Sequence, residues 1–226
     1  MFLQAEVQLQ AHPIVVIIVA DFGLDVQSYC REFSKIVFPR PDNCPKCGQA
    51  NQFVGHGSYP RHPYDPEHSF LIHVKRFLCN ACHGTVSLLP SFCLPHRHYL
   101  AKTIQSVLVL RNQGSSWAAI RQRFLPADVP SLTTCREWVA AFAKASPLYL
   151  EYLLRQLASW QLAPGRLELA VADISAESSA PRQLVAAIPH LAAWLEKYRI
   201  GLTERAVGWL PALARWGHAA KLGRVV

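Results

Sequence analysis

Apolar positions near the N-terminus predict a strand followed by a helix. The run 14-IVVIIVA-20 is continuous, rich in β-branched residues and bounded by a proline and an aspartate. Seven residues are far fewer than the roughly 18 that a membrane-spanning helix needs, so this run predicts a buried strand over about 13–20. The next apolar residues, in 26-VQSYCREFSKI-36, have helical spacing and follow Asp25, a predicted N-cap. Residues 1–40 are therefore expected to form a small βα unit.

The next segment, residues 41–97, is poor in apolar residues. Stretches such as 55-GHGSYPRHPYDPEHS-69 consist mainly of turn-forming and polar residues. The one clear element is 70-FLIHVKRFL-78, in which apolar residues alternate as they do in a strand. A short β-rich segment with so small a core usually needs a disulfide or a metal to fold.

From residue 98 onward, apolar residues return at helical spacing. Gly114 and the turn 126-PADVP-130 interrupt this pattern. Three helices are expected, over residues 98–112, 117–124 and 132–145. Three short helices with a tight turn before the last resemble a helix-turn-helix, which we expect over residues 98–145.

The C-terminal region, residues 146–226, is apolar and mostly helical in pattern. Helices are expected within 147-PLYLEYLLRQLASW-160 and 186-AAIPHLAAWLEKYRIGL-202. Between them, 167-LELAVADIS-175 predicts a strand.

Charge is concentrated in the middle of the chain. The net charge is +8, and residues 31–144 hold 14 Lys and Arg against 6 Asp and Glu, with seven of the ten histidines. Residues 1–30 hold three acids and no Lys or Arg, and residues 145–226 hold nine bases and six acids. A localised basic block suits an anionic partner such as nucleic acid, although charge of this kind also serves solubility. The first ten residues lack the basic start of a secretory signal, so we expect a cytoplasmic protein and no membrane partner.

Four of the seven cysteines form two Cys-x-x-Cys pairs, Cys44 with Cys47 and Cys79 with Cys82, and a glycine follows each pair closely. Two such turns can direct four thiolates to one tetrahedral zinc ion. A redox site of the thioredoxin type would need one pair at the start of a helix, which this pattern does not provide. We therefore expect one structural Zn²⁺ and a zinc ribbon over 41–97.

The spacing between the pairs, 31 residues, is longer than is usual for this pattern, and we expect residues 49–70 to form an excursion between two hairpins. With four protein ligands the site is closed, so the metal is expected to stabilise the fold and not to catalyse a reaction. Other side chains that could compete as ligands are His56, His62, His73 and His83. The remaining cysteines, Cys30, Cys93 and Cys135, are expected to be small buried apolar residues.

The third predicted helix is the candidate recognition helix. Its outward positions near the N-terminus are Thr133, Thr134, Arg136 and Glu137. Arginine can bind guanine through two hydrogen bonds, and threonine can contact a thymine methyl group or a phosphate. Further phosphate contacts are expected from Arg111, Arg121, Arg123, Lys75 and Arg76. Each of these side chains could equally be a solvated charge on an amphipathic element.

A catalytic function is not expected. Asp173, at the end of a predicted strand, could be the first of the metal-binding carboxylates that transposases use, but the acids after it lie in a mostly helical pattern. Neither a phosphate-binding glycine loop nor a Ser/His/Asp order is evident.

Several motifs together resemble a known group of proteins. They are CPKCG at residues 44–48, 55-GHGSYPR-61, 75-KRFLCNACHGTVSLLPSFCLPHRHY-99 and 134-TCREW-138. Over roughly residues 14–143 the chain resembles the small zinc-ribbon and helix-turn-helix proteins of mobile elements. It looks most similar to the DUF6431 family, which shares its ribbon pattern with the N-terminal regions of insertion-sequence transposases. The resemblance implies that the four paired cysteines bind zinc and that the module binds DNA in transposition.

Three functions are therefore carried forward on an α+β fold with a βα unit, zinc ribbon, helix-turn-helix and helical C-terminal tail. The first is a non-catalytic, zinc-stabilised protein that binds double-stranded DNA in the bacterial nucleoid, in transposition or in regulating a mobile element, with a transposase or other protein as a further partner. The second is an adaptor whose zinc ribbon docks a partner protein. The third is a truncated or degenerate transposase.

Overall fold

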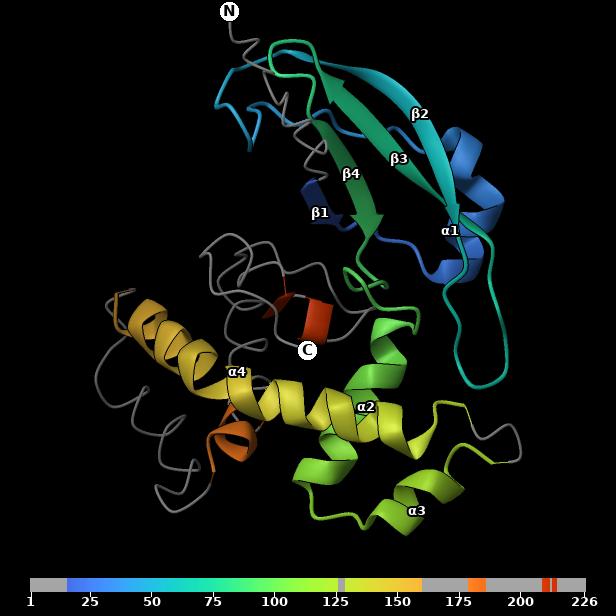
Figure 1. Ribbon diagram of the computed structural model, residues 1–226, viewed down its shortest axis with the longest axis vertical. Helices are drawn as coiled ribbons and strands as arrows, with labels where there is room; N and C mark the ends of the chain where they lie inside the picture. Colours follow the sequence, from blue (N-terminus) through green and yellow to red (C-terminus); the bar gives the residue numbers. More distant parts are fainter. Residues whose placement is uncertain (1–15, 126–128, 160–178, 186–208, 212, 215–226) are drawn as a thin grey trace, which may run out of the picture.

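The structure is a computed structural model, and it describes residues 16–125, 129–159, 179–185, 209–211 and 213–214. Strands and helices are both present, as expected for an α+β protein, and the sheet and the longer helices occupy different ends of the molecule (Figure 1). The elements are β1 (Val16–Ala20), α1 (Val26–Glu32), a 3₁₀ turn η1 (Phe33–Lys35), β2 (Phe53–Arg61), β3 (Ile72–Cys79), β4 (Thr85–Pro90), α2 (Ala101–Asn112), α3 (Trp117–Gln122) and α4 (Leu132–Ser159).

The four strands form one sheet in the order β1-β4-β3-β2. Strands β2, β3 and β4 are antiparallel, and β1 lies parallel to β4, from Val16 opposite Val86 to Ala20 opposite Pro90. Strand β1 therefore joins the cysteine-bearing segment in a single sheet, and helix α1 contacts β3.

Strand β2 corrects the expectation that residues 49–70 form an excursion between two hairpins. Phe53 lies opposite Cys79 and Arg61 lies opposite Ile72, with a bulge between Gly55 and Ser58. Most side chains of β2 are exposed, so no apolar alternation marks the strand in the sequence. Backbone pairing with β3 forms the strand where the sequence shows mainly turn residues.

One face of the sheet packs against α1. The Asp25 side chain accepts a hydrogen bond from the N–H of Ser28 (2.7 Å), which confirms its role as the N-cap. Tyr29 is fully buried, and its hydroxyl donates to the carbonyl of His73 in β3 (2.9 Å). The helix ends at Glu32 and one 3₁₀ turn follows, so the predicted helix over 26–36 is shorter than expected.

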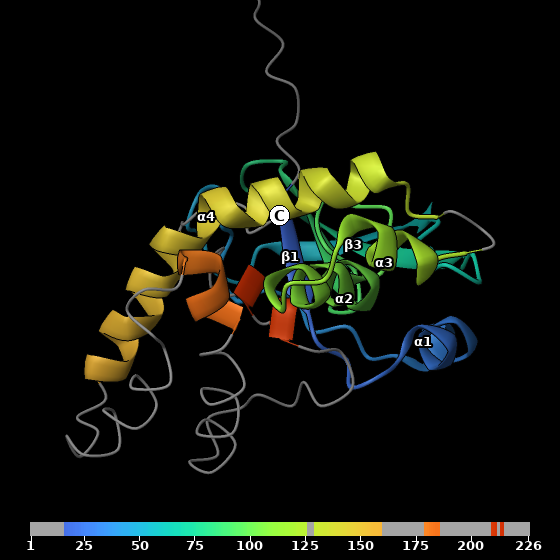
Figure 2. The same ribbon diagram turned by 90° about the horizontal axis from the view of Figure 1, so that it is seen from below.

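Helices α2, α3 and α4 enclose a second, larger core. Its buried side chains come from all three helices and include Ile104, Leu108, Ile120, Trp138 and Phe142. Helix α4 crosses α2 in Figure 1, and Figure 2 shows that α4 changes direction along its length. Among the residues that the structure describes, no charged side chain of these three helices is buried.

Helix α4 corrects the prediction of two helices over 132–145 and 147–160. It is one helix of 28 residues that contains Pro147. Proline in a helix removes one hydrogen bond and costs about 3 kcal/mol. Tyr149, two residues later, is fully buried in the same core, and the Ser146 hydroxyl donates to the carbonyl of Phe142 (2.6 Å). Tertiary packing on both sides of Pro147 therefore keeps the helix continuous.

A loop between two strands of the sheet contacts the start of helix α2. This loop, residues 62–71, connects β2 to β3 and reaches the start of α2 (Figure 1). The N–H of Tyr64 donates to the carbonyl of His98 (3.0 Å), and the N–H of Leu100 donates to the carbonyl of Tyr64 (2.9 Å). Asp65 forms an ion pair with Lys102 of α2 (3.0 Å). We call residues 62–71 the docking loop, because these contacts fix the position of the sheet relative to α2.

The C-terminal predictions lie mostly outside the described residues. The predicted strand 167–175, which contains Asp173, and the predicted helix 186–202 both lie outside the described residues. Residues 180–185, just before that predicted helix, are helical. Among the helices that the structure describes, none has the length and apolar content needed to cross a bilayer.

Candidate metal centre

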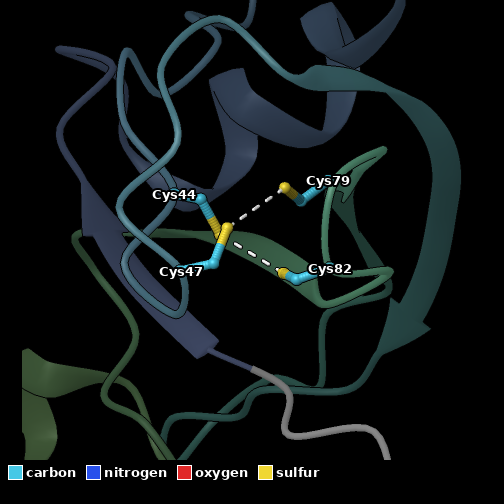
Figure 3. A group of neighbouring side chains, drawn as sticks. All are labelled: Cys44, Cys47, Cys79 and Cys82. Carbon is cyan, nitrogen blue, oxygen red and sulfur yellow. Dashed lines mark hydrogen bonds between the residues drawn. The ribbon is translucent and has the colours of Figure 1, made fainter.

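The structure brings the four paired cysteines together at one end of the sheet (Figure 3). Cys44 and Cys47 lie in the turn before β2, Cys79 is the last residue of β3, and Cys82 lies in the turn that leads into β4. Their four sulfur atoms all lie within 4.8 Å of one another. The sequence prediction that these four residues form one cluster is therefore confirmed.

The distances between the sulfur atoms fit a shared metal ion. The Sγ atoms of Cys44 and Cys82 are 3.7 Å apart, and those of Cys47 and Cys79 are 3.8 Å apart. Four sulfurs placed tetrahedrally at about 2.3 Å from a zinc ion are about 3.8 Å from each other. A disulfide would require about 2.05 Å, and all four cysteines are free thiols. The cluster has the dimensions of a tetrahedral metal site that could hold an ion such as zinc.

The two cysteine turns have the same backbone hydrogen bonds. In the first, the N–H of Cys44 donates to the carbonyl of Gln49 (2.9 Å), and the N–H of Gly48 donates to the carbonyl of Cys44 (2.8 Å). In the second, the N–H of Cys79 donates to the carbonyl of Gly84 (2.9 Å), and the N–H of His83 donates to the carbonyl of Cys79 (2.8 Å). Each turn thus closes on its own backbone and presents two thiols to the other.

Glycine has a different role in each turn. Gly48 has a φ of 75°, and the corresponding residue of the second turn, His83, has a φ of 55°. Gly84 instead provides space, because a Cβ atom there would lie 3.1 Å from Cδ of Lys46 and 3.3 Å from Sγ of Cys82. The first glycine favours a backbone conformation that His83 adopts at the corresponding position, and the second allows the close approach of the two turns.

The acidities of the first cysteine pair show how the thiols influence each other. Burial opposes ionisation of Cys44, but backbone N–H groups of Cys47 and Lys46 outweigh it and lower the pKa of this thiol to about 7. For Cys47, the N–H of Gln49 favours the thiolate, but desolvation and the three other thiols outweigh it and raise the pKa to about 12. One thiolate in the cluster therefore disfavours a second, and a cation is the group that would allow all four to ionise.

One side of the cluster is embedded in apolar residues. Cys44 and Cys79 are buried and pack with Phe53, Phe77 and Val86. Cys47, in contrast, is exposed. An ion would be able to enter from the side of Cys47 and would then be surrounded by four protein ligands, which leaves no position for a substrate.

Other candidate ligands do not join the cluster. Over the part of the chain that the structure describes, the group contains the four cysteines and none of the histidines considered as competitors, namely His56, His62, His73 and His83. Of the remaining cysteines, Cys93 and Cys135 are buried as expected, but Cys30 is exposed. Its thiol donates to the carbonyl of Leu71 (3.4 Å).

Asp65 is a buried acid that the sequence analysis did not single out. It lies beside Glu67 and His68, and these three side chains are close enough to share a metal ion. Its carboxylate already accepts hydrogen bonds from the N–H groups of Glu67 (3.0 Å) and His68 (2.8 Å) and pairs with Lys102. These bonds satisfy the buried charge, so its position indicates a structural role in the docking loop. The sequence did contain a signal for this turn, the motif DPEH, because an aspartate often accepts hydrogen bonds from backbone N–H groups shortly after it in a turn.

The predicted nucleic-acid contacts fall into two groups. Arg111, at the end of α2, and Arg136, near the start of α4, both lie against the ring of Trp117. Lys75 and Arg76 lie on β3, where they contact Phe77 and Tyr59 respectively. The structure therefore brings two of the predicted arginines together and places the two basic residues of β3 on the sheet.

The remaining predicted contacts lie along α3 and the start of α4. Thr133, Glu137 and Arg121 are exposed, as is Arg123 just after α3. Thr134 is only half-exposed, and its N–H is bonded to the hydroxyl of Ser131 (3.3 Å), which caps the helix. Trp117 is partly exposed, and it packs against the helical core.

Comparisons with known proteins give one finding. No curated protein and no solved structure matches the chain significantly. A family model does match the part of the chain that begins at Cys44 and includes all four clustered cysteines, α2 and most of α3. The resemblance expected from the sequence is confirmed by this match, and it is a resemblance of residues 44–121 to the family described as Domain of unknown function (DUF6431).

Proposed function

We propose that the protein is a non-catalytic DNA-binding protein whose sheet is stabilised by one structural zinc ion. The observation that supports zinc is the group of four sulfurs within 4.8 Å, with separations of 3.7 and 3.8 Å across the two turns. Tetrahedral sites of four thiolates hold zinc or iron, and zinc is the metal without redox chemistry of its own. A closed site of this kind contributes to folding and not to catalysis.

DNA is the proposed partner because basic side chains gather on the helices next to the sheet. Residues 98–145 carry six Lys and Arg against two Asp and Glu. Arg121, Arg123 and Arg136 are exposed there, and Thr133 is exposed in the first turn of α4. We propose that α3 and α4 act as a helix-turn-helix, in which the first part of α4 enters the major groove of double-stranded DNA. The place of this activity is proposed to be transposition or the regulation of a mobile element, on the resemblance described above.

Metal analysis tests the zinc part of this proposal. The purified chain is expected to contain about one zinc ion, and iron or no metal would contradict it. Titration with a thiol reagent gives an independent readout, because four bound thiolates react slowly and four free thiols react at once.

Selection of bound sequences from a random pool of duplexes tests the DNA part. Enrichment of a motif is expected, and the variant Thr134→Ala, Arg136→Ala is expected to bind the enriched duplex more weakly. Binding is expected to weaken steeply as the salt concentration rises, because each phosphate contact releases counterions. A chain that binds no duplex and instead captures a protein partner with little salt dependence would be an adaptor.

A further inference from the structure

Trp117 connects two arginines that come from different helices. The guanidinium carbon of Arg111 lies 5.0 Å from the centre of the Trp117 ring, and that of Arg136 lies 5.6 Å from it. Both distances are within the range of cation–π contacts, about 6 Å. The residues belong to α2, α3 and α4, so three helices converge on this ring.

The position of this cluster is fixed by the helical core. Ile120, one turn after Trp117, is fully buried, and so is Leu108 before Arg111. Trp138 is also buried, two residues after Arg136. One N–H group of Arg111 also donates to the carbonyl of Ser115 (3.0 Å) in the turn before α3. The ring and the two arginines are therefore held in place by packing beneath them.

The two positive charges have no acidic partner in the described part of the chain. Within those residues, neither guanidinium has a carboxylate within 4.0 Å, whereas Arg155, further along α4, is paired with Glu151. Two like charges on one ring repel each other, and an anion placed beside both relieves that repulsion. Arg136 and the partly exposed Trp117 leave the cluster accessible to such an anion.

A guanidinium that lies on an aromatic ring still has its N–H groups available at its edge. The ring contacts the flat face of the guanidinium, while the N–H donors point outward in its plane. Those donors match the oxygens of a phosphate group. A side chain held in this way also loses less conformational freedom when it binds.

We propose that Arg111, Trp117 and Arg136 form a phosphate clamp for double-stranded DNA, in which the two arginines contact backbone phosphates and Trp117 is a positioning residue. The clamp rests on the proposed function and changes one assignment within it. Arg136 contacts the backbone, not a guanine edge, because its guanidinium is held against the ring at the helix surface. Reading of bases is then left to other residues of α4, such as Thr133.

Salt dependence of binding tests the clamp. The zinc-loaded full-length chain is titrated with a mixed-sequence DNA duplex over a range of salt concentrations. Replacing either arginine, in Arg111→Gln or Arg136→Gln, is expected to lower the slope of log K against log salt by about 0.9, the contribution of one phosphate contact. Arg155→Gln, on the same helix as Arg136, is the matched control and is expected to keep the wild-type slope.

Two further variants separate positioning from charge. Trp117→Leu leaves both charges in place, so the slope is expected to stay while the affinity falls about fivefold through lost preorganisation. Arg136→Lys is expected to behave in the same way, because lysine keeps the charge but lacks the planar group. A melting curve for each variant shows whether it is folded, and Arg136→Lys provides the test if Trp117→Leu is not.

The outcomes distinguish the clamp from the proposed function. If the wild-type chain binds no duplex, both are wrong. If it binds with a salt-dependent affinity and both glutamine variants keep its slope, only the clamp is wrong. If Arg136→Gln weakens binding to one selected sequence but not to the mixed duplex, Arg136 reads a base, and the clamp is again overturned.

Discussion

The sheet and the helical region are stabilised in different ways. Around the cysteines, two of the six buried apolar residues in the described cluster are the thiols Cys44 and Cys79 themselves. Around α2 and α4, the described core is larger and contains Trp138, Phe142 and Tyr149, each almost or fully buried. From this difference we expect the turn-rich end, with its few buried apolar side chains, to depend on a bound metal for folding, and the helical end to fold by burial of its apolar side chains. Six substitutions can break or sharpen this contrast.

Loss of one cysteine ligand is expected to have the largest effect. Cys79→Ser removes a buried thiol of the cluster, and the metal contribution to folding in small zinc domains is about 10 kcal/mol or more. We expect the sheet to lose its structure and the chain to lose its metal, as measured by metal analysis and by NMR signals of the strands.

The matched control is the same substitution in the helical core. Cys135 is also buried, but it lies in α4. Cys135→Ser is expected to cost about 1–3 kcal/mol for burying a hydroxyl, and to leave the metal content unchanged. Equal loss of metal in both variants would show that the contrast between the two regions is wrong.

Truncation of the helical core is expected to have the next largest effect. Trp138 is 1% exposed, and its ring packs edge-on against Tyr99 at 5.0 Å between centres. Trp138→Ala is expected to lower the free energy of unfolding by about 3–5 kcal/mol, as measured by denaturant titration. The four cysteines remain in place, so the metal-to-protein ratio is expected to stay the same. A chain that also loses its metal would indicate that the helices support the cysteine cluster directly.

Alanine substitution at two glycines with positive φ is expected to have a smaller effect on stability, and the two positions can be compared as a pair. Gly48 (φ 75°) lies in the first cysteine turn and Gly114 (φ 92°) lies after α2, and neither would have a neighbour within 4 Å of an added Cβ atom. Alanine at either position is expected to cost about 1–2 kcal/mol, because the left-handed conformation is unfavourable for it. Only Gly48→Ala is expected to lower the affinity for zinc, as measured by competition with a chelating dye. A similar decrease in zinc affinity for Gly114→Ala would contradict the contrast between the cysteine turns and the helical region.

The docking loop is expected to give the smallest effect. Asp65 is buried, which opposes its ionisation, but the hydrogen bonds from Lys102 and from the N–H groups of Glu67 and His68 outweigh this and lower its pKa. The side chain of Lys102, the other member of the ion pair, is largely exposed. Asp65→Asn is therefore expected to cost about 1 kcal/mol near neutral pH.

The pH dependence of this cost follows from the sign of the shift. A carboxyl group with a lowered pKa stabilises the fold above its unfolded value of about 3.9, and this contribution disappears as the pH falls through the folded value. The difference in unfolding free energy between wild type and Asp65→Asn is thus expected to be present near neutral pH and to shrink as the pH falls below about 4. A difference that grows in acid would contradict the proposed role of the carboxylate. Comparison at equal pH removes the effect of acid on the cysteines, which both chains share.

Much of the metal site could be predicted because its signal is local. The spacing Cys-x-x-Cys places two thiols in one turn, and two such turns supply the four ligands of a tetrahedral site. The role of Gly84 could not be predicted, because it depends on Lys46 and Cys82 approaching it in space. The ion pair of Asp65 with Lys102 could not be predicted for the same reason, since Lys102 lies far along the chain.

The helices and strands show a similar division. Strand β3 and helices α2 and α3 were predicted at nearly their observed positions because their apolar spacing is regular. Strand β2 was missed because backbone pairing, and not side-chain burial, forms it. The continuation of α4 through Pro147 was missed because the burial of Tyr149 is a property of the assembled core.

The docking loop also couples local opening of the sheet to local opening of the helical region. The amides of Tyr64 and Leu100 are both bonded across the joint between the loop and the start of α2. Their hydrogen exchange with solvent requires this joint to open, and elements joined in this way tend to open as one cooperative unit. Release of the metal would loosen β2 and β3, which carry the docking loop at their connection. The start of α2 would then exchange faster as well, so a metal bound by the four cysteines would protect backbone amides near the start of α2.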